Sequence, residues 1–261
     1  MTKVLYTGGR GRMGRVIRER LQGRYDQVVL YSRQADDTAL FSGEHEIIGD
    51  LADLDALTRA AQDVDVIVHL GGVTDETDYA EIEQINIRGT YNVYEAARSA
   101  GVRRVVYASS NHAVGFYPAR QRIDEEVLPR PDTYYGLSKV FGEALARLYH
   151  DKWGVESVCL RIGTFRPAPT DVRQLALWLS WRDGAELVRC SIEATGIGYE
   201  IVYGCSANTD GWWDADKGWR AIGFQPQDDA ADHADAVDRT GEPPTLHGGA
   251  FADVDYRGGL W

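Results

Sequence analysis

The sequence predicts an α/β fold, in which a doubly wound parallel sheet with helices on both faces is followed by a small C-terminal lobe. Two observations lead to this fold class. Up to residue 163, short apolar and β-branched runs alternate with longer stretches of helical periodicity, which is typical of parallel strands joined by helical crossovers. Beyond that point the alternation stops. We therefore place the sheet in residues 1–163 and the lobe in residues 164–261.

The first region contains segments with the composition of buried strands and segments with the periodicity of amphipathic helices. The expected strands are KVLYT (3–7), QVVLYS (27–32), HEIIGD (45–50), DVIVHLGG (65–72), RRVVYASS (103–110) and ESVCLRIG (156–163). The expected helices span residues 13–21, 54–61, 82–99 and 134–150. In the second region we expect a helical stretch at QLALWLSW (174–181), a turn at NTDGWWD (208–214) and a loosely packed acidic tail from about residue 225.

The composition narrows the possible partners. The chain carries 40 acidic against 28 basic residues, for a net charge of −12, and lysine is scarce. An acidic surface of this kind is typical of proteins adapted to high intracellular salt, although an ordinary acidic protein remains the alternative. It argues against nucleic acid as a partner, because binding to phosphates requires a basic face.

Other sequence features favour a cytoplasmic protein without metal. No apolar run approaches the ~18 residues of a membrane span, and the first residues, MTKVLYTGG, carry no export signal. The three cysteines, Cys159, Cys190 and Cys205, are odd in number and lack CxxC spacing. We therefore expect no membrane partner, no disulfide framework and no metal site.

A glycine-rich loop, TGGRGRMG (7–14), follows the first strand and opens the first helix. Its glycines Gly8, Gly11 and Gly14 allow a tight turn and a close approach of the backbone to a pyrophosphate at the helix N-terminus. Because the loop stands between strand and helix, the first region is predicted to be a Rossmann-type dinucleotide-binding domain. Further cofactor contacts are expected from Arg12, Met13, Asp50, Leu51, Gly71, Gly72 and Asn86.

The end of the second strand, LYSRQ (30–34), bears on the identity of the cofactor. An acidic residue there would accept hydrogen bonds from the adenosine ribose and repel a 2′-phosphate. Ser32 removes this repulsion, and Arg33 can pair with a phosphate or stack on adenine. These two residues favour NADP. The alternative is that Arg33 is solvated and the glycine loop holds NAD.

Catalytic residues are predicted at the start of the expected helix 134–150. Tyr135 and Lys139 form a YxxxK pair, one helical turn apart, and Ser110 ends the fifth strand. Oxidation of an alcohol needs a base for the hydroxyl proton, and tyrosine serves only if its phenolate is stabilised. The ammonium of Lys139 would lower the pKa of the phenol, and Ser110 would hold the substrate oxygen.

Taken together, these motifs resemble the extended short-chain dehydrogenase/reductase family. VIVHLGG, ASSNHAVGFYP, YYGLSK and CSANTDGWWD are also similar to hexuronate dehydrogenases over almost the whole length. The resemblance implies oxidation of C1 of a cyclic uronic acid to a lactone with NAD. It implies substrate contacts from Thr74, Ser110, Asn111, His112, Thr164 and Arg173, with Arg173 on the carboxylate.

The same scaffold resembles the short-chain glucose-6-phosphate dehydrogenases of salt-adapted archaea. Both reactions oxidise a hemiacetal C1 hydroxyl in an anionic sugar, so the anion site must separate them. Residues 161–182 hold Arg161, Arg166, Arg173 and Arg182, and a dianionic phosphate favours more than one guanidinium. We therefore expect glucose 6-phosphate as the substrate, with Arg166 assisting Arg173, and a hexuronate as the alternative.

Two other functions are compatible with this fold. A sugar-nucleotide epimerase would use the same tyrosine, but few residues remain for a nucleotide-sugar pocket. A non-catalytic NADP-sensing regulator would not need Tyr135 and Lys139. We expect His69 to be structural. The helices expected at 82–99 and 134–150 offer faces for a homo-oligomer.

Overall fold

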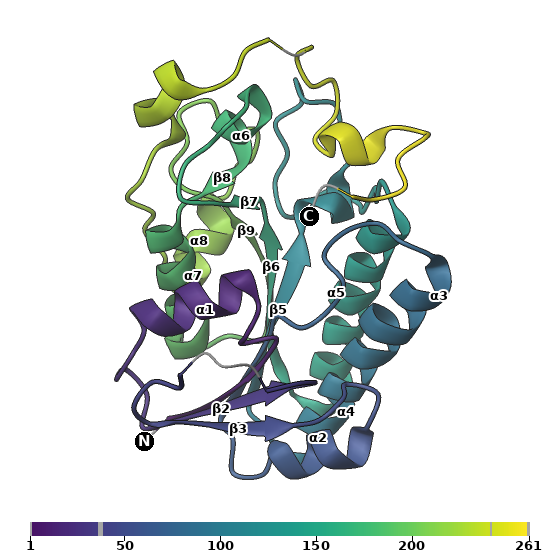
Figure 1. Ribbon diagram of the computed structural model, residues 1–261, viewed down its shortest axis with the longest axis vertical. Coiled ribbons are helices and arrows are strands. Elements are labelled where there is room, and N and C mark those ends of the chain that lie inside the picture. The colour runs from purple at the N-terminus through teal and green to yellow at the C-terminus, as the bar shows by residue number, and fades with distance from the viewer. Residues whose placement is uncertain (1, 36–38, 241, 260–261) are drawn as a thin grey trace.

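The chain forms one seven-stranded parallel sheet with helices on both faces, which confirms the predicted fold class (Figure 1). The computed structural model describes residues 2–35, 39–240 and 242–259. The strand order is β3-β2-β1-β4-β5-β6-β9. Its strands are β1 (Lys3–Thr7), β2 (Gln27–Ser32), β3 (Glu44–Ile48), β4 (Val66–His69), β5 (Arg104–Ser110), β6 (Glu156–Ile162) and β9 (Tyr199–Gly204). The order reverses between β1 and β4, where α/β sheets bind ligands at their carboxyl edge.

The two faces of the sheet are covered by different helices and hold separate cores. On β1, Leu5 packs into one core and Val4 and Tyr6 into the other, as the alternation of side chains along a strand requires. One face carries α2 (Leu54–Ala60), α4 (Gly89–Ala100) and α5 (Tyr134–Trp153). The other carries α1 (Arg12–Arg20), α7 (Trp181–Glu193) and α8 (Asp216–Ile222).

The seventh strand, β9, was not predicted from the sequence. It pairs in parallel with β6, from Ser157 opposite Tyr199 to Ile162 opposite Gly204. Its segment, YEIVYG, is buried only in its second half, so it lacks the continuous apolar run of the central strands. Because β9 and α7 come from residues 164–261, the C-terminal part of the chain also completes the sheet.

The prediction of a helix at residues 174–181 is wrong for the second half of this segment. α6 (Val172–Leu177) ends where Trp178 turns to extended backbone, and β8 (Trp178–Leu179) pairs with β7 (Thr164–Phe165). The Trp178 indole donates to the Arg166 carbonyl (2.8 Å), which fixes this turn. Ser180 then caps α7 by accepting from the Asp183 N–H (2.9 Å).

The helix expected at residues 82–99 is interrupted at its start by a π-helix. α3 (Tyr79–Ile82) leads into η1 (Glu83–Arg88), whose wider turn continues into α4. This insertion places Asn86 inside the protein, with 3% of its surface exposed. Such π-helical turns are frequent at functional sites, and this one faces the loop after β4.

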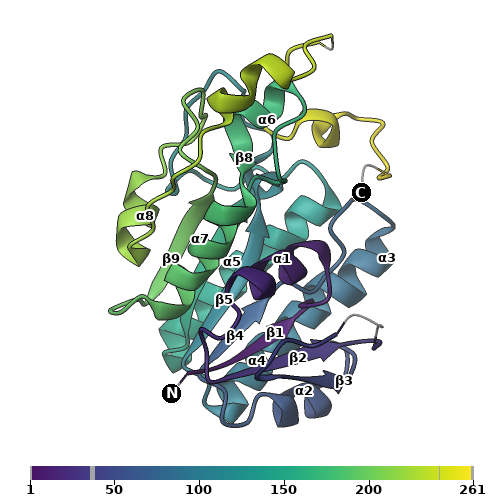
Figure 2. The same cartoon turned by 60° about the vertical axis from the view of Figure 1, so that its left-hand side comes forward.

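The C-terminal tail is packed, contrary to the expectation from the sequence. It contains η3 (Ala230–Ala236) and η4 (Gly249–Ala252), and His247 and Phe251 are buried. Figure 2 shows the tail together with α6 and β8 at one end of the molecule, beyond the carboxyl ends of β5 and β6. The His247 N–H donates to the Tyr117 carbonyl (2.9 Å), so backbone hydrogen bonds tie the tail to the loop after β5.

In residues 2–35, 39–240 and 242–259, no helix is long and apolar enough to cross a bilayer. Nor does this part of the chain contain a group of three or more His, Cys, Asp or Glu side chains placed to hold a metal ion. The cysteines Cys159, Cys190 and Cys205 are free and buried.

Candidate active site

The predicted catalytic residues meet at the carboxyl edge of the sheet, where α5 begins beside the end of β5. Thr133 caps α5 by accepting from the Gly136 N–H (2.9 Å), so Tyr135 and Lys139 lie in the first turns on one face. Both side chains are buried, each with 7% of the residue exposed. The Lys139 Nζ lies 5.4 Å from the centre of the Tyr135 ring and donates to the Ala108 carbonyl (2.9 Å).

Burial shifts the pKa values of these two groups in opposite directions. It raises the pKa of the Tyr135 phenol to about 12, and a hydrogen bond with Ser110 partly opposes this. It lowers the pKa of the Lys139 ammonium to about 8. At neutral pH Lys139 is therefore still charged and lies against the phenol, where its charge favours the phenolate.

Ser110 is the third member of the predicted catalytic set. It ends β5, and its side chain is almost fully buried. Its Oγ accepts from the His112 N–H (3.2 Å), in addition to the hydrogen bond with Tyr135. The structure thus brings Ser110, Tyr135 and Lys139 together around one position, where a substrate hydroxyl can meet both hydroxyl groups.

The glycine loop has the shape that a dinucleotide requires. Gly8 has a positive φ of 69°, and a β-carbon there would lie 2.6 Å from the Gly71 backbone N. A β-carbon at Gly14 would lie 2.7 Å from the Gly8 carbonyl. Gly11 precedes α1, whose first N–H groups point out of the helix, and Arg12 and Met13 form its first turn. These residues fit the pyrophosphate of a dinucleotide.

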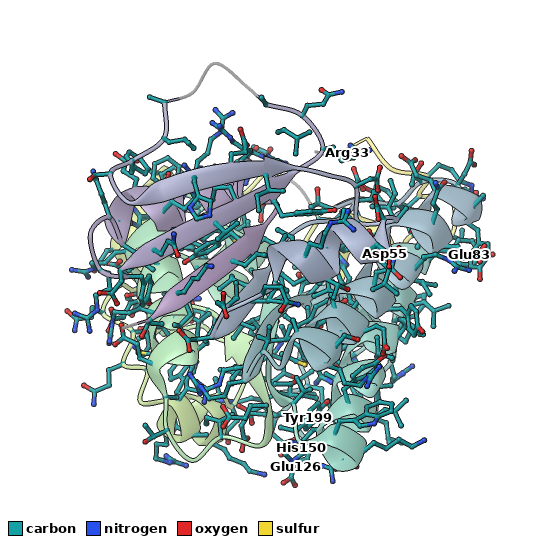
Figure 3. All side chains as sticks on the ribbon, turned by 90° about the horizontal axis from the view of Figure 1, so that it is seen from below. Arg33, Asp55, Glu83, Glu126, His150 and Tyr199 are labelled. Atoms are coloured by element: carbon teal, nitrogen blue, oxygen red, sulfur yellow. The ribbon has the colours of Figure 1, made fainter. Side chains whose placement is uncertain are left out.

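The end of β2 supplies a polar group for the adenosine half of a dinucleotide. The Ser32 hydroxyl is buried and has no hydrogen-bond partner among the residues that the structure describes, so it is available to a ribose hydroxyl. Arg33 is exposed in the loop that follows (Figure 3). Arg10 is held away from solvent by a two-point ion pair with Glu46 of β3, with both N–O distances 2.8 Å.

The loops after β3 and β4 close the cofactor site from the other side. Leu51 packs close to Gly71, where a β-carbon would lie 3.3 Å from its Cδ1 and 3.1 Å from the Thr7 hydroxyl. Asp50 is exposed, and its carboxylate accepts from the Ala52 N–H (2.9 Å). Only small side chains fit between Leu51 and the glycine loop.

Asn86 is buried, and its side chain hydrogen-bonds to the loop after β4 and to α5. Its Oδ1 accepts from the Val73 N–H (2.8 Å), and its Nδ2 donates to the Val73 carbonyl (3.0 Å) and to Ser138 Oγ (3.1 Å). A β-carbon at Gly72 would lie 2.9 Å from the same Oδ1. Asn86 therefore fixes the Gly71–Gly72 loop relative to α5.

His69 has the environment of a structural histidine. It lies between the hydroxyls of Thr7 (2.7 Å) and Thr90 (3.1 Å), and burial lowers its pKa to about 3. The imidazole is neutral at physiological pH and links β1, β4 and α4.

Arg173 lies next to Asn111, which follows the end of β5. The Arg173 Nε donates to the carbonyl of His247 (2.8 Å). With its amide oriented to satisfy both neighbours, Asn111 donates to the Ile162 carbonyl (3.2 Å) and accepts from the Arg173 Nη2 (2.7 Å). Burial lowers the pKa of Arg173 to about 10. Among the described residues, Arg173 forms no ion pair.

His112 is buried beside Tyr135 in a cage of charged and aromatic groups. Its Nδ1 lies 2.7 Å from the Asp132 carboxylate, and its ring stacks on Phe251 with the centres 3.9 Å apart. Tyr135 meets the ring edge-on at 5.8 Å. Burial lowers the pKa of His112, and the charge of Asp132 only partly opposes this effect.

The remaining predicted substrate residues are more dispersed. Thr74 is exposed in the loop after β4, and Thr164 is buried on β7. Arg166 is half-buried at the end of β7, where its N–H donates to the Leu179 carbonyl (3.3 Å).

The four arginines of residues 161–182 do not form one anion site, which corrects the expectation from the sequence. Arg161 is buried in a two-point ion pair with Glu143, both N–O distances being 2.9 Å. Arg182 pairs with Asp228 at the surface. Acidic partners thus neutralise Arg161 and Arg182, so the four arginines cannot act together on one substrate anion.

Comparison with known proteins agrees with this geometry. Residues 4–171 match the NAD dependent epimerase/dehydratase family. The chain belongs to this family. A uronate dehydrogenase from Pseudomonas putida is 42% identical over 258 residues, covering 96% of this chain and 95% of that protein. An NAD-dependent glucose-6-phosphate dehydrogenase from Haloferax volcanii is 35% identical over 248 residues, covering 88% of this chain and 94% of that protein.

This epimerase/dehydratase family member is also similar in its fold to a solved structure. A mutant uronate dehydrogenase from Agrobacterium tumefaciens, complexed with NAD, is 40% identical, and the two chains superpose with a TM-score of 0.91 over 97% of each. Both resemblances inferred from the sequence motifs are thus confirmed.

Four residues of the site were not singled out from the sequence of this family member. Asp132 and Glu76 are acidic residues in loops, and His247 and Phe251 lie in the tail, more than 100 residues from the YxxxK pair. Asp132 lies just before that pair, which was a usable signal. Nothing local marks the other three, because their role comes from distant segments that fold onto the site.

Proposed function

We propose that this protein is an NAD-dependent dehydrogenase that oxidises the C1 hemiacetal hydroxyl of a hexuronate to its lactone. The observation that carries the proposal is Arg173, a half-buried guanidinium at the catalytic edge without an ion pair among the described residues. Its position is fixed by the His247 carbonyl and by Asn111, which leaves the rest of its fork for a planar carboxylate. The close uronate dehydrogenase relatives support the same substrate class.

In this proposal each catalytic residue has one task. Ser110 donates a hydrogen bond to the C1 oxygen and orients it, and the Tyr135 oxygen removes the hydroxyl proton. As that O–H bond breaks, the C1–H bond breaks as well, and C1 becomes the lactone carbonyl carbon. The glycine loop and the start of α1 would hold NAD, whose nicotinamide would supply the acceptor for the hydride that leaves C1. The charge of Lys139 stabilises the Tyr135 phenolate that receives the proton.

The structure weakens the argument that favoured glucose 6-phosphate. That argument needed a cluster of guanidiniums, but Arg161 and Arg182 pair with Glu143 and Asp228. A dianion would meet Arg173, with Arg166 as the second candidate. The Haloferax relative keeps glucose 6-phosphate as the second candidate substrate.

NAD is also the better supported cofactor for this chain. The buried Ser32 hydroxyl suits a ribose hydroxyl, and Arg33, exposed beyond it, does not require a 2′-phosphate. The mutant uronate dehydrogenase that superposes on this chain is complexed with NAD. NADP therefore becomes the alternative that an assay must exclude.

A steady-state assay of reduced nicotinamide formation tests the proposal. Galacturonate, glucuronate and glucose 6-phosphate are each combined with NAD and with NADP, and kcat/KM is compared. We expect the highest value for a uronate with NAD. Turnover of the phosphate sugar alone would assign Arg173 to a phosphate, and no net reduction of either cofactor would favour an epimerase or a sensor.

Arg173→Lys tests the anion site directly. A lysine keeps the charge but loses the planar fork, so we expect KM for the uronate to rise about tenfold or more, with a smaller change in kcat. Arg182→Lys is the matched control, because Arg182 pairs with Asp228 at the surface. Equal effects of the two substitutions would overturn the assignment.

A further inference from the structure

Asp132 and His112 form a buried pair whose geometry is fixed by the backbone. Asp132 Oδ2 lies 2.7 Å from His112 Nδ1, and the carboxylate side chain has no exposed surface. A β-carbon at Gly115 or Gly248 would lie 1.7 or 2.1 Å from this oxygen. Glycine backbone therefore fills the space around the carboxylate and leaves it no other position.

The second carboxylate oxygen of Asp132 is also committed. Thr133 Oγ1 lies 3.0 Å from Oδ1 and accepts from the Gly136 N–H (2.9 Å), so its proton is directed at Asp132. Asp132 thus accepts hydrogen bonds on both sides. The His112 ring is held between Phe251, which stacks on it, and Tyr135, which meets it edge-on.

These contacts decide which nitrogen of His112 carries the proton. Burial lowers the pKa of His112, so the ring is neutral at neutral pH and carries one N–H. A carboxylate accepts but cannot donate, and this N–H must therefore be on Nδ1. The Nε2 lone pair is left, and no side chain in the described ranges hydrogen-bonds to it.

We propose that His112 Nε2 acts as an obligate hydrogen-bond acceptor for one ring hydroxyl of the sugar, and that Asp132 is the positioning residue that sets this polarity. The proposal rests on the proposed function and deepens it. The site then has donors at Arg173 and an acceptor at His112. A sugar bound in the reverse orientation would place its carboxylate against the Nε2 lone pair of His112, which repels it. Arg173 and His112 together therefore favour the one orientation that places C1 at Tyr135.

The tautomer can be measured without a substrate. In protein with ¹⁵N-labelled histidine, the His112 signals, assigned by their loss in His112→Phe, should show the Nδ1–H form at pH 7. Asp132→Asn should shift them toward the Nε2–H form, because the carboxamide keeps the Thr133 bond only by presenting its NH₂ to Nδ1. Asp216→Asn on the exposed face of α8 is the matched control and should leave the spectrum unchanged. An Nε2–H or doubly protonated ring in the wild-type protein would overturn the proposal.

Substrate analogues test the hydroxyl contact. Among single-deoxy uronates, we expect one to lose about 10-fold or more in kcat/KM with the wild-type enzyme and to lose little in His112→Phe, which has no acceptor. Equal losses in both proteins for every analogue would refute the contact. Failure of every uronate to react would refute the proposed function, whereas the tautomer spectrum decides the polarity of His112 independently.

Discussion

At the scale of single residues, we propose that Lys139 lowers the pKa of Tyr135. Burial is the main cause that raises the pKa of the phenol to about 12, so the neutral form dominates across the physiological range. The hydrogen bond with Ser110 lowers this pKa, and the Lys139 ammonium, 5.4 Å from the ring centre, is the nearby positive charge that would favour the phenolate.

Lys139→Met should therefore move the rise of kcat with pH to higher pH and lower kcat at pH 7 by about 100-fold. The measurement is the pH profile of kcat for uronate oxidation. Lys152→Met, at the exposed end of the same helix, is the matched control and should leave the profile in place. A lower kcat with an unshifted profile would show that Lys139 only positions the cofactor.

Much of this site was predictable from the sequence, because Ser110, Tyr135 and Lys139 lie at strand and helix ends with recognisable spacing. The arginine cluster was not, because a count of arginines cannot show that Glu143 neutralises Arg161 inside the core. Sequence spacing places residues on elements. It does not show which buried charges already have partners.

At the scale of elements, the N-terminus of α5 is held by a carboxylate from another loop. Glu76, after β4, accepts from the N–H groups of Tyr134 (3.3 Å) and Tyr135 (2.8 Å). These N–H groups would otherwise lack a partner in the first turn of the helix, and the negative charge suits the positive end of its dipole. Glu76 thus links the loop after β4 to the backbone of Tyr135.

Glu76→Gln should lower kcat several-fold and the free energy of unfolding by about 1 kcal/mol, because a neutral amide caps α5 less well. Steady-state kinetics and urea denaturation measure the two effects. Glu81→Gln, which removes a charge from the exposed side of α3, is the control. An unchanged kcat in Glu76→Gln would show that the cap has no part in placing Tyr135.

The central elements were predicted well, since strands buried on both faces give continuous apolar runs and their crossover helices give a clear period. The predicted secondary structure was wrong where hydrogen bonds between residues far apart in the sequence fix the backbone conformation. Trp178 leaves the helical conformation because its indole and carbonyl bind Arg166 and Asn208. Helical periodicity in 174–181 could not reveal either contact.

At the scale of the whole molecule, the net charge of −12 predicts a dependence of stability on salt. Exposed carboxylates repel one another more strongly in the folded protein than in the expanded unfolded chain. Raising KCl from about 0.1 M to about 1 M shortens the screening length from about 10 Å to about 3 Å. We therefore expect the melting temperature to rise over this range. A fall would show that screened ion pairs, such as Arg24–Glu193, outweigh the repulsion.

Two buried histidines predict how the whole fold responds to acid. Burial lowers the pKa of His69 to about 3 and of His247 to about 4, while an unfolded histidine titrates near 6.5. Below pH 6.5 the unfolded chain therefore binds protons that the folded chain does not. Stability is fully present above this pH and is lost as the pH falls, by about 1.4 kcal/mol per pH unit for each histidine, until the folded pKa is reached.

His247→Gln should accordingly reduce the loss of unfolding free energy between pH 7 and pH 4.5 by about 2 to 3 kcal/mol, whatever it does to stability at pH 7. Urea denaturation at a series of pH values measures the slope. His45→Gln, on the outer strand β3, is the control. Equal slopes for the wild-type protein and His247→Gln would mean that His247 gains its proton without unfolding. In that case the tail, whose His247 carbonyl accepts a hydrogen bond from Arg173, would open in acid while the sheet stays folded. As the pH is lowered, the protein would then lose uronate binding before it unfolds.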